Sequence, residues 1–167
     1  MIVIKNVLVA TDFSPASDTA LSYGRELARH FGGTLHVLHV VDNIYAHMVG
    51  SDAAIGAMIP STLQAEMEQS AQRRLDALVA EDDRRELNAK PVLLTGNGTA
   101  VSIVTFAREA AIDVIVVGTT GRGPMSHLLM GNVAEKVVRT APCPVLTVRH
   151  PEHEFVLPDA LQRVSRS

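Results

Sequence analysis

Apolar residues recur along this chain in two alternating patterns, short runs typical of buried strands and longer stretches with helical spacing between them. The short runs are rich in Val, Leu and Ile, and they predict five strands. These strands cover residues 6–11, 35–41, 90–95, 114–117 and 144–149. Strands separated by helices favour parallel β/α units with right-handed crossovers.

The first predicted helix follows Ser14, which is typical of an N-cap, and a proline in the first turn. It ends at the glycine pair of residues 32–33. A second, long helix follows Ser61 and Gln64, whose spacing matches a capping box. The charge cluster of residues 81–86 is interpreted as the solvated end of that helix.

Two more helices complete the pattern. One follows the turn at residues 96–99, and the other covers residues 133–140. Between the second strand and the long helix, residues 42–60 are too apolar for a plain solvent loop, and we interpret them as a mobile flap or partly ordered loop. Residues 150–167 are predicted to be a loosely held tail beyond one domain of residues 1–149.

These elements predict an α/β fold, a doubly wound five-stranded parallel sheet of order 3-2-1-4-5 with helices on both faces. In that order the chain reverses direction between the first and fourth strands. Ligands bind at such switch points, outside the carboxyl ends of the strands. Asp12 and Gly118 both lie there.

The fourth strand leads into a glycine-rich stretch. Glycines stand at positions 118, 121 and 123, and a second turn, Gly131-Asn132, opens the last helix. Bare backbone amides and a helix N-terminus suit an anion. The spacing matches neither the P-loop nor the Rossmann fingerprint.

The spacing Gly118-x2-Gly121-x9-Gly131-Asn132 resembles the G-x2-G-x9-G-[ST] nucleotide motif of the universal stress protein family. The resemblance covers roughly residues 3 to 149, and shorter stretches match in order at residues 9–14, 38–42 and 141–146. Asn132 departs from the family motif, which has Ser or Thr there. Its amide can still donate to a phosphate, so we expect binding to be weakened or re-aimed.

The resemblance implies that ATP or a related adenine nucleotide binds in the cleft between the first and fourth strands, as a ligand that biases conformation or partner choice. The implied nucleotide contacts are Ala10, Thr11, Asp12, Val40, Val117, Gly118, Gly121, Arg122, Gly123, Gly131, Asn132 and Val133. Asp12 has three alternative roles: capping the turn around Ser14, accepting a hydrogen bond from the ribose or base, or helping to hold Mg²⁺. Arg122 is either a phosphate partner or a solvated surface arginine.

Composition narrows the function classes. The net charge of −3 gives no basic field for nucleic acid or an anionic membrane. The single cysteine, Cys143, excludes an intrachain disulfide and fits a reducing compartment, and we expect it to be a packed thiol. The seven histidines show no zinc pattern. With no signal-like segment and no long apolar run, we expect a cytoplasmic protein.

Efficient phosphoryl transfer lacks its usual residues, because neither a Walker lysine nor a catalytic base is recognisable. Ser126 and His127 lie near the glycine loop, but no partner carboxylate is identifiable for a triad. The alternatives to a nucleotide-binding regulator are a dimeric stress protein that binds no nucleotide and a slow nucleotide hydrolase.

The fifth strand is an edge in the predicted order. Its residues Val145, Leu146, Thr147 and Val148 are strongly β-forming and uncharged. Such an edge is an aggregation hazard unless it is covered. We expect two copies to pair through it as a homodimer, which the resemblance also implies, with a tail folded over its own edge as the alternative.

Overall fold

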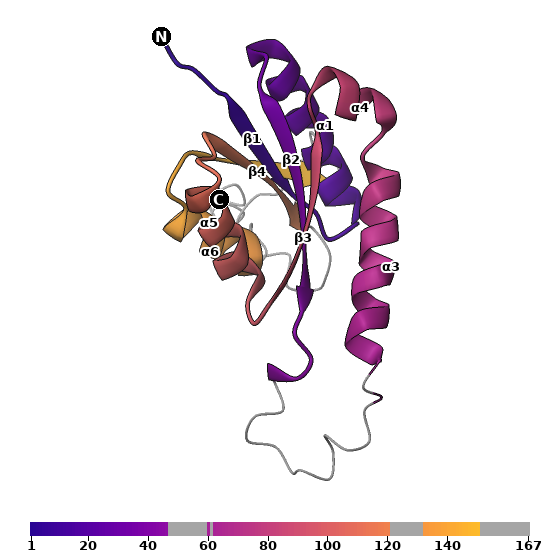
Figure 1. The fold of residues 1–167 in the computed structure, drawn as a ribbon. Coiled ribbons are helices and arrows are strands. Elements are labelled where there is room, and N and C mark those ends of the chain that lie inside the picture. The colour runs from indigo at the N-terminus through magenta and orange to yellow at the C-terminus, as the bar shows by residue number, and fades with distance from the viewer. Residues whose placement is uncertain (47–59, 61, 121–131, 151–167) are drawn as a thin grey trace, which may run out of the picture.

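A computed structural model describes residues 1–46, 60, 62–120 and 132–150 (Figure 1). The elements in chain order are β1 (Asn6–Ala10), α1 (Pro15–Phe31), β2 (Thr34–Asp42), α3 (Leu63–Leu78), α4 (Glu81–Glu86), β3 (Lys90–Gly96), α5 (Thr99–Glu109), β4 (Val114–Thr120), α6 (Asn132–Thr140) and β5 (Val145–His150). Each of the five predicted strands is therefore present, within three residues of its expected ends.

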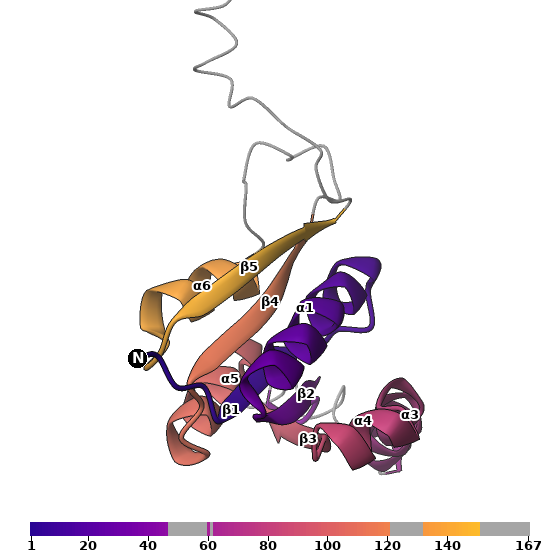
Figure 2. The same cartoon turned by 90° about the horizontal axis from the view of Figure 1, so that it is seen from above.

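The strands form one parallel sheet in the order β3-β2-β1-β4-β5. Helices α1, α3 and α4 cover one face, and α5 and α6 cover the other (Figures 1 and 2). The predicted fold class and strand order are confirmed. The chain reverses between β1 and β4, as a doubly wound sheet requires.

The core is aliphatic on both faces, in keeping with an aromatic content of only 4%. On the α1 side it includes Val9, Leu35 and Leu75, and on the α5 side it includes Ile103 and Ile115. Apolar residues on alternate strand positions pack against opposite helix layers, because successive side chains of a strand face opposite sides of the sheet. This packing fixes the register and with it the level at which each strand ends.

Strand β4 does not end at Gly118, as the apolar run suggested, but continues to Thr120. Gly118, Thr119 and Thr120 pair with residues 148–150 of β5. The backbone ladder carries the strand past the point where apolar side chains stop. Gly118 is therefore a strand residue and not a loop residue.

The need for glycine at position 118 comes from α1. A Cβ atom there would lie 2.5 Å from the carbonyl oxygen of Ala16 and 2.9 Å from the amide nitrogen of Ser17. Real Cβ atoms are not found that close to backbone. Gly118 thus allows the first turn of α1 to rest directly on β4.

The expected capping box of the long helix is corrected by the structure. Helix α3 begins at Leu63 after Thr62, and Ser61 lies outside the described residues. The Gln64 side chain accepts a hydrogen bond from the backbone amide of Ile44 (3.1 Å) and donates one to Glu68 (3.0 Å). Gln64 therefore ties the start of α3 to the segment after β2 instead of capping the helix.

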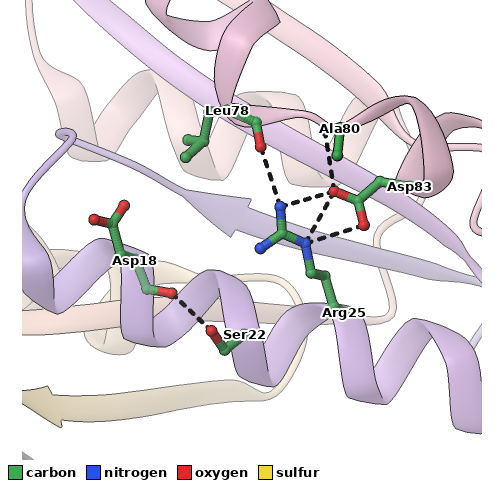
Figure 3. A network of polar contacts seen from close by, with 6 residues as sticks. All are labelled: Asp18, Ser22, Arg25, Leu78, Ala80 and Asp83. Atoms are coloured by element: carbon green, nitrogen blue, oxygen red, sulfur yellow. Dashed lines mark hydrogen bonds and ion pairs between the residues drawn. The ribbon is translucent and has the colours of Figure 1, made fainter.

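The interpretation of residues 81–86 as a solvated helix end was wrong in one respect. They form a separate helix, α4, and the Asp83 side chain is buried. Both Asp83 oxygens accept hydrogen bonds from Arg25 of α1, the shortest at 2.7 Å, and Arg25 also donates to the Leu78 carbonyl at 3.1 Å (Figure 3). A cluster of charged residues in the sequence cannot reveal a partner on another helix.

Two predicted segments cannot be compared with the structure. Most of the apolar stretch after β2 (residues 47–59) and the tail (residues 151–167) lie outside the described residues. Their roles therefore stay predictions.

Candidate functional site

A cavity of ≈ 280 Å³ lies at the carboxyl ends of β1 and β4, at the switch point of the sheet. Its walls come from both central strands, from β2 and from the helices that begin at this end. The lining residues are Ala10, Thr11, Asp12, Ser14, Ser17, Leu38, His39, Val40, Thr99, Ile103, Val117, Gly118, Asn132, Val133 and Ala134.

One wall of this cavity is apolar. Ala10, Val40 and Val117 contribute small or branched side chains from three adjacent strands, and Ile103 closes the wall from α5. Val40 and Val117 are buried. A flat apolar group of ligand can displace water here without leaving a polar protein atom unpaired.

The opposite wall is polar because β1 ends in a tight turn. The Thr11 amide donates to the Leu38 carbonyl (2.9 Å), which fixes the end of β1 against β2. The Phe13 amide donates to the Thr11 hydroxyl (3.0 Å), and the Ser14 amide donates to the Asp12 carboxylate (3.0 Å). These bonds place the Asp12 carboxylate at the cavity wall.

The Asp12 carboxyl is held in its ionised form. Partial removal from water raises its pKa, but hydrogen bonds, above all those from Ser14, lower it by more, so the pKa lies below the ordinary value. At neutral pH the side chain can therefore only accept hydrogen bonds or bind a cation. The expected capping role of Asp12 is present, and it leaves the residue on the cavity wall.

The first turn of α1 is closed by a chain of hydroxyl bonds. The Ser17 hydroxyl donates to the Ser14 carbonyl (2.9 Å), so its single proton is used. The 3.0 Å contact between Thr11 and Ser17 must then be a donation from the Thr11 hydroxyl. This chain links the end of β1 to the start of α1 behind Asp12.

Three helices begin at the cavity. Ser14 caps α1, Thr99 is the first residue of α5, and Asn132 is the first residue of α6. The first-turn amides of a helix lack partners within that helix, and the helix dipole is positive at this end. Converging helix N-termini favour an anionic ligand group.

A second, more open cavity of ≈ 550 Å³ adjoins the first and shares Asp12, His39 and Val40 with it. Its far wall is one face of α3, including Glu66 and Arg74. Helix α3 therefore reaches the rim of the site through this second cavity.

All of the predicted contact residues that the structure describes meet in the first cavity. They are Ala10, Thr11, Asp12, Val40, Val117, Gly118, Asn132 and Val133. Gly121, Arg122, Gly123 and Gly131 lie outside the described residues, so their predicted roles are untested.

The sequence prediction missed several lining residues. Ser17 and Thr99 stand at helix starts that were recognised, and His39 lies on the predicted second strand. Helix-start signals could have placed Ser17 and Thr99 at this end of the sheet. His39 could not be found in that way, because its approach depends on a bond to Thr11 across the sheet.

The other candidate chemistry lies elsewhere. Among residues 1–46, 60, 62–120 and 132–150, no group of three or more His, Cys, Asp or Glu side chains could hold a metal.

Burial, and then the charge of Asp113, raises the pKa of the Cys143 thiol, which agrees with the expected packed, unreactive side chain. His36 faces Phe106 of α5, whereas His39 stacks on Phe13, so the two histidines face opposite sides of the sheet as predicted.

Residues 4–149 match the sequence profile of the universal stress protein family. This chain belongs to that family. A universal stress protein of Methanocaldococcus jannaschii is 33% identical over 150 residues, which cover 90% of this chain and 85% of that protein.

Solved structures of universal stress proteins have the same fold. A family member from Burkholderia pseudomallei is 30% identical with a TM-score of 0.63, covering 86% of this chain and 95% of that one. A universal stress protein from Archaeoglobus fulgidus, solved in complex with dAMP, is 23% identical with a TM-score of 0.61, covering 89% and 99%. None of the helices in the described part of this universal stress protein is long and apolar enough to cross a membrane.

Proposed function

We propose that this universal stress protein binds an adenine nucleotide, with ATP as the first candidate, in the cavity between the ends of β1 and β4. The nucleotide acts as a ligand that biases conformation or partner choice. The observation that carries the proposal is the cavity itself. It joins an apolar wall, an ionised carboxylate and the N-termini of α1, α5 and α6 at one switch point.

Each wall suits a different part of a nucleotide. The apolar side chains of Ala10, Val40 and Val117 suit the flat base. The Asp12 carboxylate suits a ribose hydroxyl, because an ionised carboxylate is an acceptor. The start of α6 at Asn132 and Val133 suits phosphate oxygens.

The size of the cavity supports the same assignment. Its ≈ 280 Å³ is close to the lower end of the range of about 300–1,000 Å³ for small-molecule pockets. A base and ribose fill such a space, and phosphates then extend along the start of α6. The glycine motif at positions 121, 123 and 131, together with Arg122, is proposed to complete the phosphate contacts.

Magnesium is proposed only as a companion of the phosphates. Mg²⁺ commonly binds through one or two carboxylates plus phosphate oxygens and water. Asp12 supplies one such carboxylate on the cavity wall. The fit is to a nucleotide-bound ion and not to a site made by the protein alone.

A relative supports the ligand class. The Archaeoglobus fulgidus universal stress protein of the same fold was solved in complex with dAMP. At 23% identity it supports an adenine nucleotide in general, and ATP is our own choice within that class.

We do not propose that the bound nucleotide is hydrolysed rapidly. A carboxylate whose pKa lies below its ordinary value is a weak general base, so Asp12 is poorly suited to activate water. Slow hydrolysis, and a family member that binds no nucleotide, are the alternatives. Reducing surroundings suit the single cysteine, and the cytoplasm is the proposed location.

We also propose a homodimer through the outer edge of β5. The Ile115 amide donates to the Pro144 carbonyl (3.0 Å), so by strand alternation Leu146 and Val148 direct their N–H groups to β4. Val145 and Thr147 then direct theirs to the outer edge. Leu146 and Thr147 are exposed there, which suits pairing with a second copy.

The dimer is tested by Thr147→Pro, which removes an outward-facing donor and leaves the β4 ladder intact. Light scattering is expected to show a dimer for the unmodified protein and for Thr147→Ala, and a monomer for Thr147→Pro. An unmodified protein that is monomeric at micromolar concentration would contradict the proposed assembly.

The nucleotide proposal is tested by denaturing the purified protein and identifying released small molecules by mass, followed by thermal unfolding with added ATP and Mg²⁺. Ligand binding to the native state raises the melting temperature. Asp12→Ala is expected to reduce this increase, whereas Asp18→Asn in the first turn of α1 is expected to leave it unchanged. If neither a released nucleotide nor a rise with ATP, AMP or cAMP is seen, the protein belongs to the alternative that binds none.

A further inference from the structure

Phe13, next to Asp12, has an unusual backbone conformation. Its φ is +60°, in the left-handed region that bulky side chains rarely occupy. Such a conformation costs free energy and persists only where neighbouring groups hold it in place. Whatever holds Phe13 also determines how the turn presents Asp12.

The ring of Phe13 is held between two side chains from different elements. The imidazole of His39 on β2 lies 4.4 Å away between ring centroids, tilted by 39°. The guanidinium carbon of Arg74 on α3 lies 4.1 Å from the ring centroid, a cation–π contact. The ring also packs against the core cluster on the α1 side.

His39 is itself fixed to the same turn. Its Nδ1 lies 2.7 Å from the carbonyl oxygen of Thr11. A carbonyl only accepts, so Nδ1 carries the proton and donates it. His39 therefore holds the backbone before Asp12 while its ring supports the residue after it.

Arg74 differs in its kind of contact from the arginines that form ion pairs. Arg74 stacks on the Phe13 ring, whereas ion pairs with carboxylates are formed by Arg25, Arg29, Arg84, Arg85 and Arg139. Arg74 also lines the second cavity beside Asp12. Its stacking on Phe13 makes α3 part of the support of the Asp12 turn.

We propose that Arg74 is a positioning residue for the ligand site: by stacking on Phe13, it holds the strained turn that aims Asp12 into the first cavity. The position of α3 then sets ligand affinity, although Arg74 does not line that cavity. This gives partners that contact α3 a route to the site. The inference rests on the proposed nucleotide binding, but the turn itself can be measured without a ligand.

The first measurement is the affinity for ATP by calorimetry. An exposed cation–π contact has a modest value, so Arg74→Ala is expected to weaken binding about two- to fivefold. Arg73→Ala removes the same charge one residue away and is the matched control, with unchanged affinity. In an Asp12→Ala background, Arg74→Ala is expected to have no further effect, because its effect is transmitted through Asp12.

The second measurement is the titration of the Asp12 carboxyl by carbon-detected NMR in the absence of nucleotide. Loosening the turn weakens the Ser14 hydrogen bond, so the pKa of Asp12 is expected to rise in Arg74→Ala and in Phe13→Leu, but not in Arg73→Ala. Equal Asp12 titrations in all four proteins would overturn the inference. If the unmodified protein binds no nucleotide, the proposed function fails and this titration alone decides the role of Arg74.

Discussion

The two ends of the central sheet carry similar polar residues but use them in opposite ways. At the amino end, Asp113 precedes β4, and at the carboxyl end Asp12 follows β1. Both are aspartates next to a central strand. Asp12 lines both of the cavities described above, and Asp113 lines neither of them.

Asp113 is used to close the backbone. One of its carboxylate oxygens accepts from the amides of Lys5 (2.7 Å) and Asn6 (2.8 Å). The Asp113 amide donates to the Asn6 carbonyl (2.9 Å), and the Asn6 side chain donates to the Ala111 carbonyl (3.2 Å). The Asp113 carboxylate is thus already engaged in hydrogen bonds that hold the fold together.

At the carboxyl end the backbone bonds stop and the helices begin. Asp12 binds the Ser14 amide through one oxygen and still lines the cavity. The difference follows from topology. In a parallel sheet the chain leaves the carboxyl end of a strand and enters a helix, so the unpaired first-turn amides of several helices lie at this end. Similar residues therefore stabilise the fold at one end and are available to a ligand at the other.

We expect the largest loss of stability at Gly118, which lies near the carboxyl end of the sheet and also packs against α1. Gly118→Ala places a Cβ atom 2.5 Å from the Ala16 carbonyl oxygen and should cost about 1–3 kcal/mol of unfolding free energy. In Gly98→Ala the new Cβ has only ordinary contacts, starting at 3.8 Å from Val101, so the cost should stay below about 1 kcal/mol. Urea unfolding compares the two. Equal losses would mean that α1 does not rest on Gly118.

Breaking the amino end should affect stability and leave binding unchanged. Asp113→Ala removes the acceptor for two amides and should cost about 1–3 kcal/mol, measured by urea unfolding. ATP affinity at the far end of the sheet should stay within twofold. A large loss of affinity in this variant would show that the two ends are coupled and would contradict their separation.

The two ends should also differ in pH response. Burial, and then the charge of Lys90, lowers the pKa of His36, whose buried Nδ1 has no hydrogen-bond partner among the residues that the structure describes. The unfolded chain therefore takes up a proton first, and stability falls as the pH drops below the ordinary value near 6.5. Asp12, whose folded pKa also lies below its ordinary value, loses its contribution only in stronger acid.

The check is the melting temperature from pH 7.5 to pH 5.5. In His36→Phe the melting temperature should decrease less over this pH range, since the variant has no side chain to protonate at this position. A slope identical to that of the unmodified protein would show that His36 does not cause the fall.

The smallest expected effect concerns the motif departure at the start of α6. Asn132→Ser restores the family residue and should strengthen ATP binding by about 0.5–1.5 kcal/mol, the net value of one hydrogen bond. Calorimetry measures the change, with Lys136→Ser, four residues further along α6, as the control. Weaker binding in Asn132→Ser would mean that Asn132 already makes the phosphate contact.

Much of this comparison could be predicted from the sequence. The central strands are buried on both faces, so they appear in the sequence as apolar runs that can be recognised locally. Their order is a common one for a doubly wound sheet, and it brings Asp12, Val117 and Asn132 together. Contacts between distant segments could not be predicted. The bond from Arg25 to Asp83 spans 58 residues, and the stack of Arg74 on Phe13 depends on where α3 crosses the sheet.

Gly118 shows, at a single position, how far the sequence alone can predict the role of a residue. Its position in a glycine motif predicted a loop and a ligand, and the residue does line the cavity. The structure adds that β4 continues through it and that α1 packs on it. A glycine needed for close packing and a glycine needed for a ligand look the same in a sequence.

The most direct test of the account is an amide NMR titration of the labelled protein with ATP and Mg²⁺. We expect saturable shifts at the carboxyl end, at Thr11, Asp12, Val117 and Asn132. The amides of Lys5, Asn6 and Asp113 at the amino end should stay unchanged. Shifts centred on the amino end, or no saturable shifts with ATP, AMP or cAMP, would contradict the claim that the cavity between β1 and β4 is a nucleotide site.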